Sequence, residues 1–230
     1  MHPSFSIYVT SLPDALEMLL LCRLEIIDWF HHVDNVHGVT DDIQDIRDVS
    51  DFMTQEERVL KPEEGIPLYC QRLARIYKRE ESIGGLPINM EGFCLFDKDH
   101  RSSKPLNMAY KAAQLAAPEK ADTFLVALRH ATVIDCLPTT HFDMIMRVIR
   151  DTGIDEASFI RHYQDGSAED ALNEDLNFAG RLGIHSLPAY LIQYKEDALL
   201  LQSFKYQDFA EAIEGLLGHE QIQRHLHNMF

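Results

Sequence analysis

The side chains that could carry out nucleophilic or redox chemistry are spread thinly along this chain. Its four cysteines are Cys22, Cys70, Cys94 and Cys136. Their wide spacing matches neither a disulfide framework nor a set of zinc ligands. We therefore interpret these cysteines as small buried thiols.

Histidines are more numerous, with twelve in the chain. Asp28, His32 and Asp34 would share one face of a strand if the side chains alternate. Three further histidines lie in the C-terminal tail, at His219, His225 and His227. A divalent metal needs convergent ligands that are oriented by outer partners, and clustering in the sequence does not supply this. We assign no metal site from the sequence.

Two Cys–His combinations are close in the sequence, Cys94 with His100 and Cys136 with His141. A nucleophilic pair of this kind also needs a third group that orients the histidine, and a pocket. The sequence shows neither, so we do not favour such a pair. Thr139-Thr140-His141 is better interpreted as the cap of a helix.

The composition restricts the classes of partner. The chain has 21 basic and 37 acidic residues and a formal net charge of −16. Such a surface repels phosphate backbones and anionic membranes, so we expect neither nucleic acid nor a membrane as a partner. No apolar run is long enough to span a membrane, and residues 15–22 lack the basic flank and cleavage site of a secretory signal. We expect a cytoplasmic protein.

The N-terminal pattern predicts a strand, a helix and a second strand. Residues 5–9 alternate like a strand, and Ser11 or Pro13 is typical of a helix start. Residues 26–33, rich in β-branched and aromatic side chains, predict a second strand, closed by Gly38. The sequence therefore indicates an N-terminal βαβ unit.

The middle of the chain is mostly helical. Residues 40–65 are acidic and contain Pro62 and Gly65, which predicts a loop with a short helix. Residues 68–81 have helical spacing, and Gly84-Gly85-Leu86-Pro87 breaks the chain. From 103 to 182 the pattern predicts successive helices. Their expected starts are at Pro105, Pro118, Thr139 or Thr140, Asp155, and Ser167 with a capping box.

The C-terminal region returns to strand patterns. Gly183 follows the last apolar helical position, where a left-handed residue is favoured. Residues 189–194 and 199–204 predict two strands of a hairpin around the polar turn Lys195-Glu196-Asp197. Pro188 directly precedes the first of them, a position where proline is tolerated. Residues 207–217 predict a final amphipathic helix.

The element order is thus βαβ, a helical block and ββα. With this order, several segments resemble the DsbA-like branch of the thioredoxin superfamily: Met90-Glu91-Gly92-Phe93, residues 103–113, Gly166-Ser167-Ala168 and residues 182–192. That branch includes cytoplasmic DsbA-family and FrnE-type proteins, 2-hydroxychromene-2-carboxylate isomerase and kappa-class glutathione transferases. The resemblance implies an α/β thioredoxin-like fold with an inserted all-helical domain. We expect residues 1–45 and 183–230 to form the thioredoxin-like domain and residues 46–182 to form the insertion.

The resemblance also implies where the site should be. In this family the first strand leads into Cys-x-x-Cys at a helix N-terminus, which stabilises a thiolate. Here that place is occupied by Ser11-Leu12-Pro13-Asp14, and Leu187-Pro188 matches the family's cis-proline loop. Serine and aspartate form no disulfide, and Cys22 would lie about 16 Å further along the helix at about 1.5 Å per residue. We therefore expect a thiol–disulfide oxidoreductase-like protein without dithiol exchange at this position.

Two other functions remain open. By resemblance to the kappa-class transferases and the chromene isomerase, Ser11 would be the catalytic residue of a glutathione-dependent isomerase or transferase. Leu12, Pro13, Asp14, Leu187 and Pro188 would then bind the thiol. Alternatively, the groove beside cis-Pro188 would hold an extended peptide, as in a non-enzymatic adaptor. Ser11 is equally consistent with a plain helix N-cap. The expected partner is a small thiol or a peptide, glutathione is the co-substrate considered, and a homodimer is left open.

Overall fold

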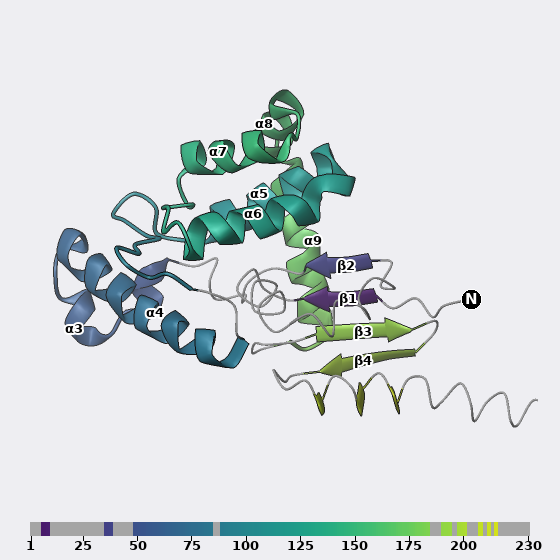
Figure 1. Cartoon of the computed structure of the whole chain (residues 1–230), viewed down its shortest axis with the longest axis horizontal. Coiled ribbons are helices and arrows are strands. Elements are labelled where there is room, and N and C mark those ends of the chain that lie inside the picture. Colours follow the sequence, from purple (N-terminus) through teal and green to yellow (C-terminus); the bar gives the residue numbers. More distant parts are fainter. Residues whose placement is uncertain are drawn as a thin grey trace, which may run out of the picture.

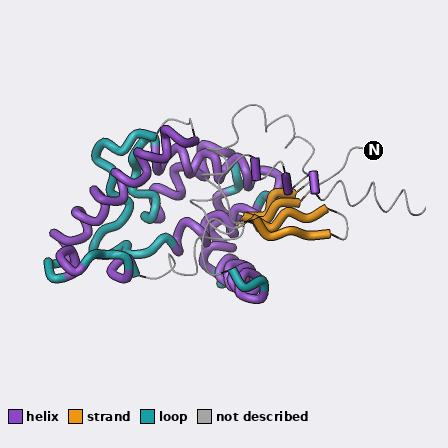
Figure 2. Tube along the Cα trace, turned by 90° about the horizontal axis from the view of Figure 1, so that it is seen from below, coloured by secondary structure: helices purple, strands orange, loops and turns teal. Residues whose placement is uncertain are grey.

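The computed structural model describes residues 6–9, 35–38, 48–84, 88–184, 190–194, 197–201, 207–208, 211–212 and 214–215. Within this part of the chain, the strands form a small sheet at one end and most of the helices pack together beside it (Figures 1 and 2). The arrangement is the α/β layout that the sequence predicted, with a helical segment between two parts of one sheet.

The sheet has four strands in the order β2-β1-β3-β4. They are β1 (Ser6–Val9), β2 (Asn35–Gly38), β3 (Tyr190–Tyr194) and β4 (Asp197–Leu201). β1 is parallel to β2 and antiparallel to β3, and β3 and β4 form an antiparallel hairpin. The predicted first strand and the hairpin are therefore confirmed.

The second strand was predicted at residues 26–33, which lie outside the described residues, as does the predicted helix after Ser11. The described strand that pairs with β1 is Asn35–Gly38, and it ends at Gly38 as predicted. β4 differs from its predicted bounds. It begins at Asp197, which pairs with Tyr194, so Asp197 belongs to the strand and not to the turn. Here backbone pairing, and not the apolar pattern, sets the start of the strand.

The helical segment follows the predicted order. Its elements are η1 (Val49–Asp51), α3 (Gln55–Arg58), α4 (Pro62–Gly84), α5 (Lys104–Ala116), η2 (Pro118–Lys120), α6 (Ala121–Val133), α7 (Phe142–Thr152), α8 (Glu156–Gln164) and α9 (Ser167–Arg181). The described residues between 207 and 215 are also helical, in agreement with the predicted last helix. No described helix is both long and apolar enough to cross a membrane.

Pro62 and Gly65 lie inside α4, so the prediction that they interrupt the chain was wrong. Proline fits the first position of a helix because the N–H that it lacks would have no helical partner there. Gly65 serves close packing: a Cβ at this residue would lie 2.3 Å from the carbonyl oxygen of Glu57. The glycine therefore lets α4 approach α3 more closely than another residue would.

The predicted caps agree with the structure at one of three helices. Asp155 caps α8 by accepting from the backbone N–H of Ser158 at 2.7 Å. In α9 the N-cap is Gly166 in a left-handed conformation, and Ser167 is the first helical residue, so the predicted capping box is wrong. In α7 the N-cap is His141, without a side-chain cap bond.

Thr139 and Thr140, predicted to cap α7, are both buried and make contacts further away. The Thr139 hydroxyl is hydrogen-bonded to that of Thr132 at 2.7 Å. The Thr140 hydroxyl donates to the carbonyl oxygen of Leu95 at 2.5 Å. Because both hydroxyl groups form hydrogen bonds with residues outside α7, neither caps this helix.

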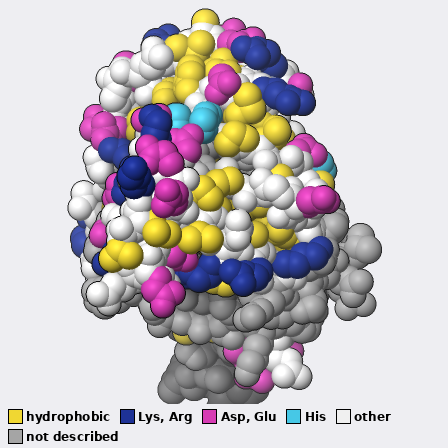
Figure 3. Space-filling view, turned by 90° about the vertical axis from the view of Figure 1, so that its left-hand side faces the viewer, with side chains coloured by type: hydrophobic (Ala, Val, Ile, Leu, Met, Phe, Trp, Pro, Cys, Tyr) yellow, Lys and Arg dark blue, Asp and Glu magenta, His cyan; other side chains and the backbone are white. Residues whose placement is uncertain are grey.

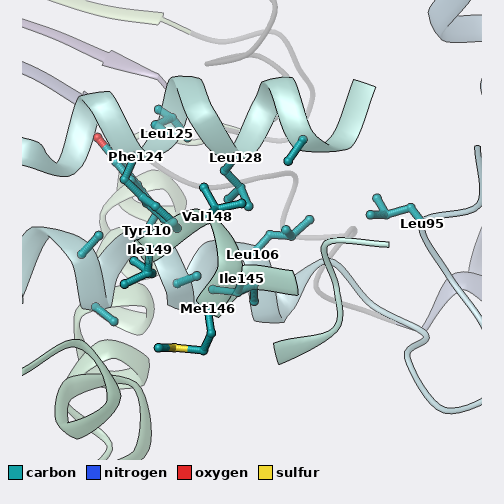
Figure 4. Packing of buried hydrophobic residues seen from close by; sticks show 14 of the residues in the cluster. Leu95, Leu106, Tyr110, Phe124, Leu125, Leu128, Ile145, Met146, Val148 and Ile149 are labelled. Atoms are coloured by element: carbon teal, nitrogen blue, oxygen red, sulfur yellow. The ribbon is translucent and has the colours of Figure 1, made fainter. Parts of the chain in front are cut away.

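The main apolar cluster lies between α5, α6 and α7. Figure 4 shows Leu106 and Tyr110 of α5 facing side chains of α6 and α7. Phe124, Ile145 and Ile149 are completely buried. Tyr190 of β3 belongs to the same cluster, so the sheet and the helices share one core.

Candidate functional site

All six predicted site residues lie outside the described residues. They are Ser11, Leu12, Pro13, Asp14, Leu187 and Pro188. The structure does describe the strand and helix ends that flank these two segments. These are the end of β1 at Val9, the start of β3 at Tyr190 and the end of α9 at Arg181.

The described residues nearest to the two segments, Val9 and Tyr190, lie at the same end of the sheet. β1 ends at Val9 and β3 begins at Tyr190, and these two residues are Cα partners in the antiparallel ladder. Partners of this kind lie about 4.5–5.5 Å apart. Ser11 follows Val9 by two residues, and Pro188 precedes Tyr190 by two. The end of β1 and the start of β3, each two residues from a predicted site segment, therefore lie side by side.

α9 is the last described helix before Pro188 in the sequence, and it ends at Arg181. Gly183 has φ 69°, the left-handed conformation that the sequence predicted. The N–H of Gly183 donates to Gly180 O at 3.1 Å, and the N–H of Ile184 donates to Ala179 O at 3.2 Å. Glycine adopts this conformation at little cost, so the helix ends sharply before residue 185.

A cluster of polar side chains connects two segments of the helical region. Asp97 lies before α5, and His141 begins α7. The imidazole Nδ1 of His100 lies 3.1 Å from Asp97 Oδ1, and Nε2 of His141 lies 2.7 Å from Asp97 Oδ2. The two imidazole rings are stacked, with centroids 3.8 Å apart and planes 24° apart. We call these three residues the Asp97–His cluster.

The backbone holds the carboxylate of this cluster in place. Asp97 Oδ1 accepts from the N–H groups of Asp99 at 2.7 Å and His100 at 2.8 Å. Burial acts to raise the pKa of Asp97, but these N–H groups and the His100 side chain lower it to about 2. The carboxyl group is therefore ionised at neutral pH.

Sequence reasoning missed this cluster. His141 is the N-cap residue of α7, in agreement with its interpretation as part of a helix cap, but its side chain makes no cap bond and contacts Asp97. The sequence did not favour a Cys94–His100 or a Cys136–His141 pair. In the structure, both histidines contact Asp97. The Asp97-x-x-His100 spacing was a local signal, but His141 is 44 residues from Asp97 and no pattern connects them.

The described cysteines are not all buried. Cys70 is buried in α4 as expected, whereas Cys94 and Cys136 are half-buried. The Cys70 and Cys94 sulfur atoms both lie within hydrogen-bonding distance of the carbonyl oxygen of Phe96, at 3.7 and 3.2 Å. A hydrogen bond with the Cys70 thiol lowers the pKa of Cys94 to about 7, while the same contact and burial raise that of Cys70. Cys94 is thus the more reactive thiol of the two.

Comparison with known protein families shows the family to which this chain belongs. A family model described as thioredoxin matches residues 40–210, which is most of the chain. The chain belongs to the thioredoxin family. No curated protein sequence matches it significantly.

Solved structures show which form of the thioredoxin fold this family member has. A candidate protein disulfide isomerase from Nitrosomonas europaea is similar with TM-score 0.67 and 14% identity, over 95% of this chain and 99% of that one. The cytosolic disulfide reductase DsbM from Pseudomonas aeruginosa has TM-score 0.60 and 12% identity, over 95% and 99%. A 2-hydroxychromene-2-carboxylate isomerase has TM-score 0.56 and 12% identity, over 96% and 98%. These likenesses confirm the predicted DsbA-like fold, a thioredoxin-like sheet with inserted helices.

Proposed function

We propose that this thioredoxin-family chain has a degenerate redox motif and binds a thiol or an extended peptide without exchanging a dithiol at the family's usual position. The observation that carries the proposal is the pairing of Val9 with Tyr190. It supports a site at which Ser11-Leu12-Pro13-Asp14 and Leu187-Pro188 converge, because both segments adjoin one end of the sheet.

The absence of sulfur at this position argues against dithiol exchange. The reaction needs a thiolate that attacks a disulfide and a second thiol that resolves the mixed disulfide. The four residues from Ser11 to Asp14 contain neither. A hydroxyl group at the start of a helix can donate a hydrogen bond to a bound thiolate, however, and the helix N-terminus favours that negative charge.

Glutathione is the thiol that we propose to test first. The isomerase has this fold, and DsbM has also been solved with GSH, at TM-score 0.58 and 13% identity. In a glutathione-dependent isomerase or transferase, Ser11 would stabilise the thiolate, and the backbone beside Pro188 would align the peptide part. The likeness to a cytosolic reductase favours the cytoplasm, where glutathione is abundant, as the compartment of this protein.

A peptide-binding adaptor is the second candidate. An extended polypeptide would lie along the same sheet end, with its backbone beside Pro188. The net charge of −16 favours basic peptides over acidic ones. This function needs no reaction at Ser11.

Calorimetry with glutathione distinguishes the two candidates. For the thiol-binding function, reduced glutathione binds to the wild-type chain, and Ser11→Ala weakens binding about tenfold because a hydrogen bond to a charged group is lost. S-methylglutathione, which cannot form a thiolate, should bind equally to both proteins. No binding of glutathione at millimolar concentration would exclude the thiol function and leave the adaptor.

A further inference from the structure

We propose that the Asp97–His cluster binds a divalent transition metal of the zinc class. This site is separate from the proposed thiol or peptide site and does not depend on it. Two imidazoles and one carboxylate are ligands that zinc commonly takes in proteins, with water in the fourth position. Among the described residues, Asp97, His100 and His141 are the group whose ligand atoms converge in this way, all within 4.8 Å of one another.

The distances from each imidazole nitrogen to the carboxylate of Asp97 are close to those between two ligands of a tetrahedral site. Ligands about 2.0–2.1 Å from zinc lie roughly 3.3 Å from one another. The nitrogen of His100 lies 3.1 Å from one carboxylate oxygen of Asp97 and 3.2 Å from the other. Nε2 of His141 lies 2.7 Å from Oδ2. An ion would replace the shared hydrogen bonds, and at least one imidazole would turn out of the stack so that both ring nitrogens point at the ion.

The carboxylate ligand is already oriented by contacts outside the cluster. Asp97 Oδ1 is held by two backbone N–H groups, which leaves Oδ2 directed toward His141. A buried hydrogen bond from the Thr140 hydroxyl to the carbonyl oxygen of Leu95 connects the segment that contains His141 to the segment that contains Asp97. On its other side, Arg101 binds the carboxylate of Asp48 at 2.6 and 2.7 Å. Such outer partners are a regular feature of metal sites, because they fix the ligands before the ion arrives.

The cluster is open to solvent on one side. The side chains of His141, His100 and Asp97 are 30%, 35% and 41% exposed. On the face shown in Figure 3, histidine side chains reach the surface beside acidic, basic and hydrophobic ones. An ion can therefore enter without unfolding the loop, and water can complete its coordination.

A second His–Asp contact provides a matched control. His130 Nδ1 lies 3.3 Å from Asp135 Oδ2, and their side chains are 60% and 52% exposed. This pair offers two ligand groups instead of three. It should bind zinc no better than an ordinary surface histidine, and its loss should leave the Asp97–His cluster intact.

Zinc titration by calorimetry, on the full-length metal-free chain, tests the proposal. The variants are Asp97→Asn, His100→Phe and His141→Gln, with His130→Ala as the control. Asparagine can still accept the two backbone N–H bonds, and phenylalanine can still stack, so these variants remove a ligand with little change in shape. Wild type and His130→Ala should show one site that each of the three cluster variants weakens at least about tenfold.

The chain's other histidines make the comparison between variants essential. If all five proteins bind zinc with the same affinity and stoichiometry, the ion sits elsewhere and the proposal is wrong. Circular dichroism identifies any variant that unfolds, and the remaining folded variants then decide. Cobalt supplies a second readout: wild type should show the visible absorption of four-coordinate Co²⁺, and its persistence in folded Asp97→Asn would also overturn the proposal.

Discussion

Val9 and Tyr190 lie directly opposite each other at one end of the β1–β3 ladder. They are 181 positions apart in the chain (190 − 9), and the helical segment lies between them. Tyr190 is fully buried and belongs to the main apolar cluster, so the start of β3 packs against the helices.

The left-handed turn after α9 should be sensitive to substitution. Gly183→Ala should lower the free energy of unfolding by about 1–2 kcal/mol, because a Cβ is disfavoured at φ 69°. Urea denaturation followed by circular dichroism measures the change.

Gly180 provides the control for this substitution. It lies inside α9, is exposed, and has open space where a Cβ would be. Gly180→Ala should raise the free energy of unfolding by up to about 1 kcal/mol, since alanine favours helices. Equal effects of the two substitutions would contradict the assigned turn.

The start of α3 should give a pH-dependent contribution to stability. Glu57 accepts from Arg72 at 3.0 and 3.1 Å and from the N–H of Thr54 at 2.7 Å. The hydrogen bonds from Arg72, against the opposing effect of burial, lower the pKa of Glu57. The carboxylate therefore stabilises the fold above the unfolded pKa of about 4.3, and this contribution is lost as the pH falls through the lower, folded pKa.

Glu57→Gln tests that dependence. At pH 7 the variant should be about 1.5–3 kcal/mol less stable, as expected for hydrogen bonds to a charged group. Thermal unfolding across pH 2 to 7 should show the difference shrinking below about pH 4. A difference that stays constant over this range would show that the charge of Glu57 contributes nothing.

Cys94 should be the first of the described Cys70–Cys94 pair to react with alkylating reagents. The hydrogen bond with Cys70 lowers the pKa of Cys94 and so favours its thiolate, whereas the same contact and burial raise the pKa of Cys70. Iodoacetamide labelling of the native chain, followed by peptide mass spectrometry, gives the rate at each residue. Labelling of Cys70 at an equal or higher rate would contradict the pKa order.

The sequence predicted the helices after residue 103 well, because each has an apolar stripe and most begin near a proline or a capping residue. It failed where a local signal was overridden by packing. Pro62 and Gly65 are helix breakers in isolation, yet α4 tolerates the first and needs the second for its approach to α3. The polar strand β2 is defined by its pairing with β1, which no local pattern reveals.

The functional residues likewise divide into those that local sequence predicts and those that only tertiary packing brings together. Gly183 was predictable because its role is decided by its neighbours in the chain. The Asp97–His cluster was not, because it forms only when the segment before α5 packs against the start of α7. The residues from Ser11 to Asp14, together with Leu187 and Pro188, remain predictions that rest on family resemblance and on the Val9–Tyr190 pairing.

The central claim is that this chain keeps the position of a thioredoxin active site but lacks its sulfur chemistry. Insulin reduction by wild type and by Ser11→Cys/Asp14→Cys tests it most directly, with Cys70→Ser/Cys94→Ser as the control for other thiols. Wild type should be inactive, and the double cysteine variant should gain turnover. Turnover by wild type that persists in the Cys70→Ser/Cys94→Ser protein, or a folded but inactive double cysteine variant, would contradict the account.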